Sequence, residues 1–249
     1  MTRVRMTQQP INTVHFPVGP IVLDPLPFRI GTERLLDALH LRAGSAQAGA
    51  VNGMVQEAYA IARPKAVYKI GYIDSRGSDH VIIDGVRFAS RVLAVNLSNA
   101  QRVFAHISTA GRELAGWAQS QDDLLASYYA DAINEAVLYG ARATLDKILR
   151  SRHEVTKVAE MNPGSLEDWP LREQRPLFEL MGGTSTTIGV ELTKSYLMVP
   201  AKSVSGLVFP TEETFASCQL CPRMTCPNRR APYDPELFAR KYRDPATVA

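Results

Sequence analysis

The chain has 249 residues, which is enough to bury one substantial core and fits either one large domain or a domain with a small appendage. Hydrophobic residues make up 45% and charged residues 21%, which excludes a disordered or fibrous protein. The net charge of +3 lacks the concentrated basic character of nucleic-acid-binding domains, so we expect no nucleic-acid partner.

The N-terminal segment, residues 1–31, predicts an extended arm with at most one edge strand. Helix formation there is blocked by five prolines, Pro10, Pro17, Pro20, Pro25 and Pro27. Prolines and Asp24 also interrupt its apolar stretch, so it does not resemble a secretory signal. No segment reaches membrane-spanning length. We therefore expect a cytoplasmic protein with no membrane partner.

The first regular elements predicted are a helix and, after it, strands; helices and strands are mixed and do not strictly alternate. Residues 51–62 carry apolar side chains at amphipathic-helix spacing, and Pro64 ends this helix. Residues 68–72 alternate between apolar and polar as a half-buried strand does, and Asp84-Gly85 between apolar runs indicates a hairpin. Antiparallel pairing follows from the hairpin.

The middle of the chain predicts a capped helix, a strand and one long helix. Ser90 is a suitable N-cap for a short helix, and residues 103–107 form a strand pattern. Residues 122–150 contain no proline, are rich in alanine and leucine, and repeat near helical spacing. The fold class is therefore α+β: a mixed, mainly antiparallel sheet flanked by helices, one of them long.

After residue 160 we expect a helix from Trp169-Pro170 to Met181, then strands over 188–198 and 203–209. Beyond Pro210 the composition changes to cysteine, proline and arginine. The predicted organisation is an arm over 1–31, an α+β domain over 32–210 and a cysteine-containing C-terminal appendage over 211–249 that packs on it.

The three cysteines of the chain, Cys218, Cys221 and Cys226, fall within nine residues. An odd count in a chain without an export signal argues against a disulfide framework and for metal or redox chemistry. Three thiolates on short loops are one ligand short of the usual four for zinc or a cubane cluster. We expect a metal site with an iron-sulfur cluster; structural zinc and unmetallated thiols are the alternatives.

Three stretches together resemble the activation domain of cobalamin-dependent methionine synthase. They are Asn162-Pro163-Gly164-Ser165 with Asp168-Trp169-Pro170, then Gly189 to Ser195, and Pro200-Ala201-Lys202-Ser203-Val204-Ser205-Gly206. Some stand-alone members of this family also end in Cys-x-x-Cys-x-x-x-x-Cys-x-x-Arg, which is Cys218, Cys221, Cys226 and Arg229 here.

This resemblance implies reductive activation of a corrinoid protein or cobalamin-dependent methyltransferase. The family transfers a methyl group from S-adenosylmethionine to cobalt after an electron has reduced it, so the cobalamin lies on the partner. The electron arrives through the cysteine site or from a separate electron-donor protein. The alternative is a docking or assembly factor for such a methyltransferase, with a structural zinc site.

The resemblance also implies which residues bind S-adenosylmethionine. They are Asn162, Pro163, Gly164, Ser165, Trp169, Lys202, Ser203, Ser205 and Gly206. Gly164 and Gly206 would let backbone approach the ligand, Lys202 would meet its carboxylate and Trp169 would stack on adenine. The structural alternative makes these a turn, a core tryptophan and a solvated lysine.

The sequence departs from the family at two positions, and it lacks two nucleotide motifs. Glu160 and Ser165 stand where the fused enzymes have an arginine and a tyrosine. Neither a phosphate-binding P-loop nor a Gly-x-Gly-x-x-Gly fingerprint occurs, which argues against an ATP-driven activator and a dinucleotide-dependent dehydrogenase. We assign no role to the five scattered histidines.

Overall fold

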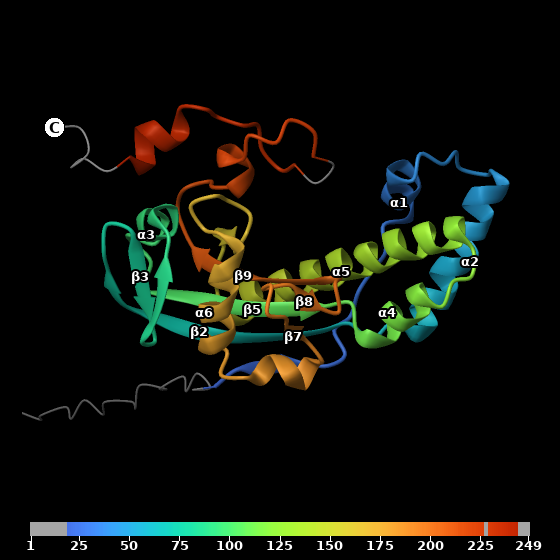
Figure 1. Cartoon of the computed structure of the whole chain (residues 1–249), viewed down its shortest axis with the longest axis horizontal. Coiled ribbons are helices and arrows are strands. Elements are labelled where there is room, and N and C mark those ends of the chain that lie inside the picture. The colour runs from blue at the N-terminus through green and yellow to red at the C-terminus, as the bar shows by residue number, and fades with distance from the viewer. Residues whose placement is uncertain (1–18, 227–228, 244–249) are drawn as a thin grey trace, which may run out of the picture.

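The computed structural model describes residues 19–226 and 229–243. Its centre is a seven-stranded sheet in the order β4-β3-β2-β5-β9-β6, with β1 also paired to β2 (Figure 1). All recorded pairings between these strands are antiparallel. The strands are β1 (Ile21–Leu23), β2 (Lys65–Arg76), β3 (His80–Ile83), β4 (Val86–Ala89), β5 (Arg102–Thr109), β6 (Val158–Met161) and β9 (Ser203–Pro210). A separate hairpin joins β7 (Glu191–Leu192) and β8 (Met198–Val199).

The long helix α5 (Leu124–His153) covers one face of this sheet (Figure 1). Asp123 caps it by accepting a hydrogen bond from the Ala126 N–H at 3.0 Å. Leu145 and Leu149 of α5 pack in one apolar cluster with Phe104 of β5. Because side chains alternate along a strand, His106 lies on the same face of β5 as Phe104, beneath α5.

The first half of α5 extends beyond the sheet and carries three further helices (Figure 1). These are α1 (Thr32–Ala38), α2 (Ala46–Ile61) and α4 (Arg112–Gln119). Val51 and Val55 of α2, Leu114 of α4 and Ile133 of α5 belong to a single buried cluster. The apolar spacing over residues 51–62 thus serves helix-to-helix packing.

The opposite face of the sheet is covered by shorter elements. They are α3 (Arg91–Asn96), η1 (Leu171–Glu173), α6 (Gln174–Leu180) and η2 (Thr184–Ile188). Leu93 of α3 and Leu177 of α6 are buried against Ile107 of β5. This core contains the largest apolar cluster among the described residues.

The C-terminal segment packs on the α3 side of the molecule. It contains the 3-10 turn η3 (Ser217–Leu220) and the short helix η4 (Phe238–Tyr242). Tyr242 is fully buried, and its hydroxyl donates to Asn96 Oδ1 at 2.8 Å. An appendage attached to the main domain was expected; how the chain divides into domains stays a prediction.

Most sequence expectations are confirmed, with one clear error. The α+β class, the Asp84-Gly85 hairpin, the Ser90-capped helix and the long helix are all present. The strand expected over 188–198 is wrong, because that stretch begins in η2 and then folds into the β7–β8 hairpin. Three elements were not anticipated: α1, α4 and β6.

Within the described residues, no helix is both long enough and apolar enough to cross a bilayer.

Candidate functional site

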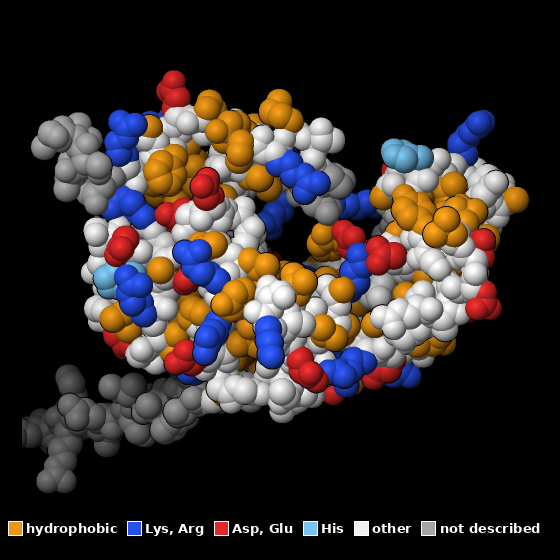
Figure 2. All heavy atoms as spheres, in the orientation of Figure 1, with side chains coloured by type: hydrophobic (Ala, Val, Ile, Leu, Met, Phe, Trp, Pro, Cys, Tyr) orange, Lys and Arg blue, Asp and Glu red, His pale blue; other side chains and the backbone are white. Residues whose placement is uncertain are grey.

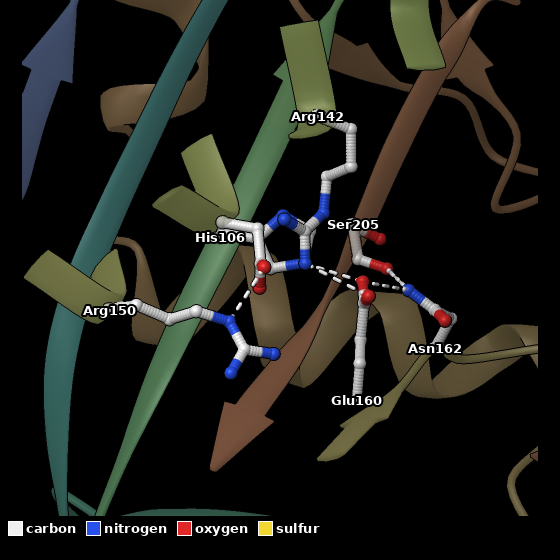
Figure 3. A network of polar contacts seen from close by, with 7 residues as sticks. His106, Arg142, Arg150, Glu160, Asn162 and Ser205 are labelled. Carbon is white, nitrogen blue, oxygen red and sulfur yellow. Dashed lines mark hydrogen bonds and ion pairs between the residues drawn. The ribbon is translucent and has the colours of Figure 1, made fainter. Parts of the chain in front are cut away.

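A buried polar network lies between α5 and strands β5, β6 and β9 (Figure 3). Glu160 of β6 is at its centre. Its Oε1 lies 3.0 Å from both His106 Nε2 and Asn162 Nδ2, and its Oε2 lies 2.9 Å from Arg142 Nη2. Figure 3 shows Arg142 reaching down from α5 while His106 and Asn162 point toward the same carboxylate. The network therefore ties the helix to three strands.

The charges in this network are mutually dependent. Burial alone would raise the pKa of Glu160, but the hydrogen bond from His106 and the charge of Arg142 outweigh burial and hold that pKa well below its usual range. Burial, and then Arg142, lower the pKa of His106. A neutral His106 donates its Nε2–H to Glu160, which leaves its buried Nδ1 without a partner among the described residues.

Asn162 fixes the start of the Pro-Gly loop against β9. Its Nδ2 donates to the Ser205 carbonyl at 2.9 Å as well as to Glu160. A Cβ on Gly206 would lie 2.5 Å from that Nδ2 and 2.7 Å from the Met161 carbonyl oxygen. Only glycine fits at position 206, and the space it leaves is filled by this chain's own side chains.

The loop that follows is a tight turn with its own internal bonds. Gly164 has φ +86°, and its N–H donates to the Trp169 carbonyl at 2.8 Å. The Ser165 N–H donates to the Asn162 carbonyl at 3.1 Å. Pro163 is buried, whereas Gly164 and Ser165 are exposed. Both backbone donors of the turn are thus used inside the chain.

Lys202 forms a charged cluster with α5 at the start of β9. Its Nζ lies 2.9 Å from Asp131 Oδ2 and 3.4 Å from Glu135 Oε2. Burial opposes the charged form of Lys202, but the two carboxylates raise its pKa overall. The Asp131 side chain is 65% exposed, so one side of the cluster is open to solvent.

The nine predicted binding residues are divided between the two faces of the sheet. Lys202 and Gly206 lie on the α5 face, where Asn162 also reaches. Ser205 lies on the other face, and its Oγ donates to Gln174 Oε1 of α6 at 3.0 Å. Ser203 is two residues from Ser205 and therefore lies on the same face of β9; its Oγ donates to the Pro200 carbonyl at 2.7 Å. The two serines are therefore separated from Lys202 by the sheet.

Trp169 packs as a core residue. It is fully buried, and its ring meets Phe88 edge-on with centroids 6.5 Å apart. No face of this ring is open to a ligand in the structure. This packing favours the structural interpretation of Trp169 over adenine stacking.

The three cysteines lie in the C-terminal segment, in or after η3. All three are partly exposed, but within the described ranges no group of three or more histidine, cysteine, aspartate or glutamate side chains is placed to hold a metal ion. Burial would raise the pKa of Cys218, but the N–H groups of Arg230 and Ala231 outweigh it and lower that pKa. The metal site expected at these three cysteines stays a prediction.

A cleft of about 340 Å³ lies elsewhere, between α3 and the C-terminal segment. Asn96, Asn99, Glu213 and Lys241 are among its lining residues. None of the nine predicted binding residues lines it.

Sequence reasoning missed the partners that complete the α5 face. Glu160 attracted attention only as a departure from the family pattern, and His106 received no role. Arg142 and Glu135 sit among many charged residues of a long helix, where spacing alone does not say which face meets the sheet. The one available signal was Glu160 itself, since a carboxylate inside an apolar strand requires a partner.

Comparison with known proteins identifies the region that holds this site. Residues 123–217 match the family model described as "Vitamin B12 dependent methionine synthase, activation domain", which includes all nine predicted binding residues but none of the cysteines. Among solved structures, the fold is similar to the crystal structure of the MetH reactivation domain bound to AdoHcy, with TM-score 0.56 and 16% identity. That alignment covers 80% of this chain and 81% of the other. No curated protein sequence matches.

The matched region begins at the N-cap of α5 and runs through β6, the Asn162–Ser165 loop and β9. It therefore contains the long helix and both strands that position Glu160, Asn162 and Lys202. Residues 123–217 of this chain therefore match the vitamin B12 dependent methionine synthase activation-domain family.

Proposed function

We propose that this protein supports reductive activation of a corrinoid-dependent methyltransferase, by transfer of a methyl group from S-adenosylmethionine to the partner's cobalt. Family membership and the overall fold support this proposal. Bound S-adenosylmethionine would supply an electrophilic methyl group on a sulfonium. No group of side chains placed to hold a metal ion is found within the described residues, and we propose that a separate donor protein delivers the electron.

The observation that carries the proposal is the charged cluster of Lys202, Asp131 and Glu135. Its formal charge is one negative, and Asp131 is largely exposed. The methionine part of S-adenosylmethionine carries an ammonium, a carboxylate and a sulfonium, with a net positive charge. The two carboxylates can accept hydrogen bonds from the ammonium while Lys202 meets the carboxylate.

The strand geometry gives such a ligand a direction. Gly206 lies four residues beyond Lys202 on β9 and on the same face, a separation of about 13 Å at the usual strand rise. The Asn162–Ser165 loop adjoins Gly206. The side chains packed over Gly206 close the direct route along β9, whereas Gly164 and Ser165 of the loop are exposed. We propose that the loop bounds the far end of the site.

A binding measurement tests the ligand assignment. Calorimetric titration with S-adenosylmethionine should show binding by the unaltered protein and an affinity at least about tenfold lower for Lys202→Ala, because one charge-assisted hydrogen bond is lost. The matched control is Lys157→Ala, because the Lys157 side chain is 67% exposed and pairs only loosely with Glu212, at 3.9 Å. Equal affinities for both variants would contradict the assignment.

An activity measurement tests the reaction. Mixing the protein with a Co(II) corrinoid methyltransferase, a low-potential reductant and S-adenosylmethionine should produce the absorbance spectrum of methylcobalt. The rate should fall in Lys202→Ala and remain in Lys157→Ala. Formation no faster than in a mixture without the protein would overturn the proposed function.

One observation favours a second candidate, a factor that docks a corrinoid methyltransferase without transferring a methyl group. Both backbone donors of the Gly164 turn are satisfied within the chain, so they are not free to hold a ligand. Co-elution with the methyltransferase, together with no calorimetric signal for S-adenosylmethionine, would select this candidate.

A further inference from the structure

The C-terminal segment places Cys218 and Cys221 at the two ends of one tight turn. The Cys221 N–H donates to the Cys218 carbonyl at 3.3 Å, which closes the last turn of η3. Cys218 belongs to η3, and Cys221 is its C-cap residue. Such a turn also holds its end Cα atoms within about 7 Å, close to the range of about 4.4–6.8 Å that a disulfide spans.

The Arg229 side chain forms hydrogen bonds to the backbone of this turn. Its Nη1 donates to the Cys218 carbonyl at 2.9 Å and its Nη2 to the Cys221 carbonyl at 3.1 Å. One guanidinium thus fixes the backbone of both cysteines. The turn is further tied by the Asp234 N–H, which donates to the Gln219 carbonyl at 2.9 Å. The backbone at both cysteines is therefore held by contacts that do not involve the thiols themselves.

The thiols differ in their surroundings. The Arg230 N–H points at Cys218 Sγ from 3.4 Å, which favours a negative charge on that sulfur. The Cys226 carbonyl accepts a hydrogen bond from the Arg229 N–H at 3.2 Å. Figure 2 shows the molecular surface hollowed between the C-terminal segment and the helices at the α1 end.

We propose that Cys218 and Cys221 form a reversible intramolecular disulfide and exchange two electrons with an external disulfide. The Cys218 thiolate attacks one sulfur of that disulfide, forming a mixed disulfide and releasing one external thiolate. The Cys221 thiolate then attacks Cys218 Sγ, which forms the Cys218–Cys221 bond and releases the second external thiolate. The external disulfide is reduced, the protein dithiol is oxidised, and both cysteine protons pass to solvent.

This site is independent of the proposed methyl transfer. It lies outside residues 123–217, and no residue of the Lys202 cluster takes part in it.

Redox titration of the full-length protein tests the inference. The reduced protein is equilibrated anaerobically in buffers of reduced and oxidised glutathione, alkylated, digested and analysed by mass spectrometry. We expect one Cys218–Cys221 link per chain, reversed by dithiothreitol, with Cys226 alkylated throughout. A link that includes Cys226, or free thiols at all three positions in oxidised glutathione, would overturn the inference.

Variants separate the two steps. Cys221→Ser should accumulate glutathione on Cys218, because the resolving thiol is missing, whereas Cys218→Ser should accumulate severalfold less on Cys221. Cys226→Ser is the matched control and should titrate as the unaltered protein does. Protection of all three thiols from alkylation by stoichiometric bound iron or zinc in the reduced protein would favour the metal site and overturn the dithiol. Binding of S-adenosylmethionine should be unchanged in all three variants, which keeps this test apart from that of the proposed function.

Discussion

Arg142 Nη2 lies 2.9 Å from Glu160 Oε2, and both side chains are mostly buried, at 13% and 18% exposure. The arginine comes from α5 and the glutamate from β6, so the pair joins the long helix to the edge of the sheet. At position 160 the fused enzymes have an arginine. Here the carboxylate at that position receives a guanidinium from a different element.

Removing this guanidinium should destabilise the protein strongly. Arg142→Met keeps the length of the side chain but leaves Glu160 charged and buried without its cation, a change that typically costs about 3–5 kcal/mol. Urea unfolding followed by circular dichroism measures the loss.

The control for this prediction is the exposed pair of Arg112 and Glu191, whose side chains are 54% and 64% exposed. Arg112→Met should cost less than about 1 kcal/mol. Similar losses for the two methionine variants would show that the Arg142 pair contributes no more than a surface ion pair.

The same network predicts a pH dependence of stability. The pKa of His106 is lower in the folded chain than in an unfolded one, so the unfolded chain binds more protons as pH falls through about 6.5. The free energy of unfolding should therefore decrease from pH 7 to pH 5. His153, whose pKa is also lowered, by burial and then by Arg102 and Arg152, acts in the same direction.

Substitution isolates the contribution of His106. His106→Gln keeps an N–H near the Nε2 position and removes the titration, so the decrease between pH 7 and pH 5 should become smaller. The control is His40→Asn, because His40 is exposed and has φ +56°, which asparagine tolerates. An unchanged slope in His106→Gln would mean that the decrease has another origin.

The sequence predicted those elements that are determined by a few neighbouring residues. The Asp84-Gly85 turn, the Ser90 cap and the proline-free stretch behind α5 each carry their own chemistry, and all three appear in the structure. The stretch 188–198 has strand-like composition, yet η2 and a turn interrupt it. Gly189, with φ +74°, ends η2. The pattern of apolar residues alone does not predict such an end.

The site was harder to predict because it depends on which face of the sheet each residue occupies. A motif read along β9 groups Lys202, Ser203, Ser205 and Gly206, but alternation sends the two serines to the α6 side. The partners of Lys202 are Asp131 and Glu135, which are far away in the sequence. The motif therefore located the region, whereas tertiary pairing determined its chemistry.

Gly206 should tolerate no side chain. In Gly206→Ala the new Cβ would lie 2.5 Å from Asn162 Nδ2 and 2.7 Å from a backbone carbonyl oxygen, so β6 and the Pro-Gly loop must move. Forcing extra volume into a packed site typically costs about 1–3 kcal/mol. Urea unfolding of the variant should show this loss.

The glycine control is Gly53→Ala in α2. Position 53 is exposed, with nothing within 4 Å of the new Cβ. Alanine there should stabilise the protein by about 0.5–1 kcal/mol, because it favours the helix. Opposite signs for the two glycine variants are the expected result, and a neutral Gly206→Ala would contradict the close approach of Asn162.

The N-cap of α5 should contribute measurably to stability, because this helix carries Asp131, Glu135 and Arg142 to the sheet. Asp123→Ala removes the acceptor for the Ala126 N–H and should cost about 1 kcal/mol in thermal or urea unfolding. Asp122→Ala provides the adjacent control: Asp122 precedes the N-cap and is exposed, so its loss should cost a few tenths of a kcal/mol at most. If both alanine variants unfold alike, the Asp123 cap does not contribute to holding the start of the helix, and the position of the Lys202 cluster must depend on the packing of Ile133 and Val137 alone.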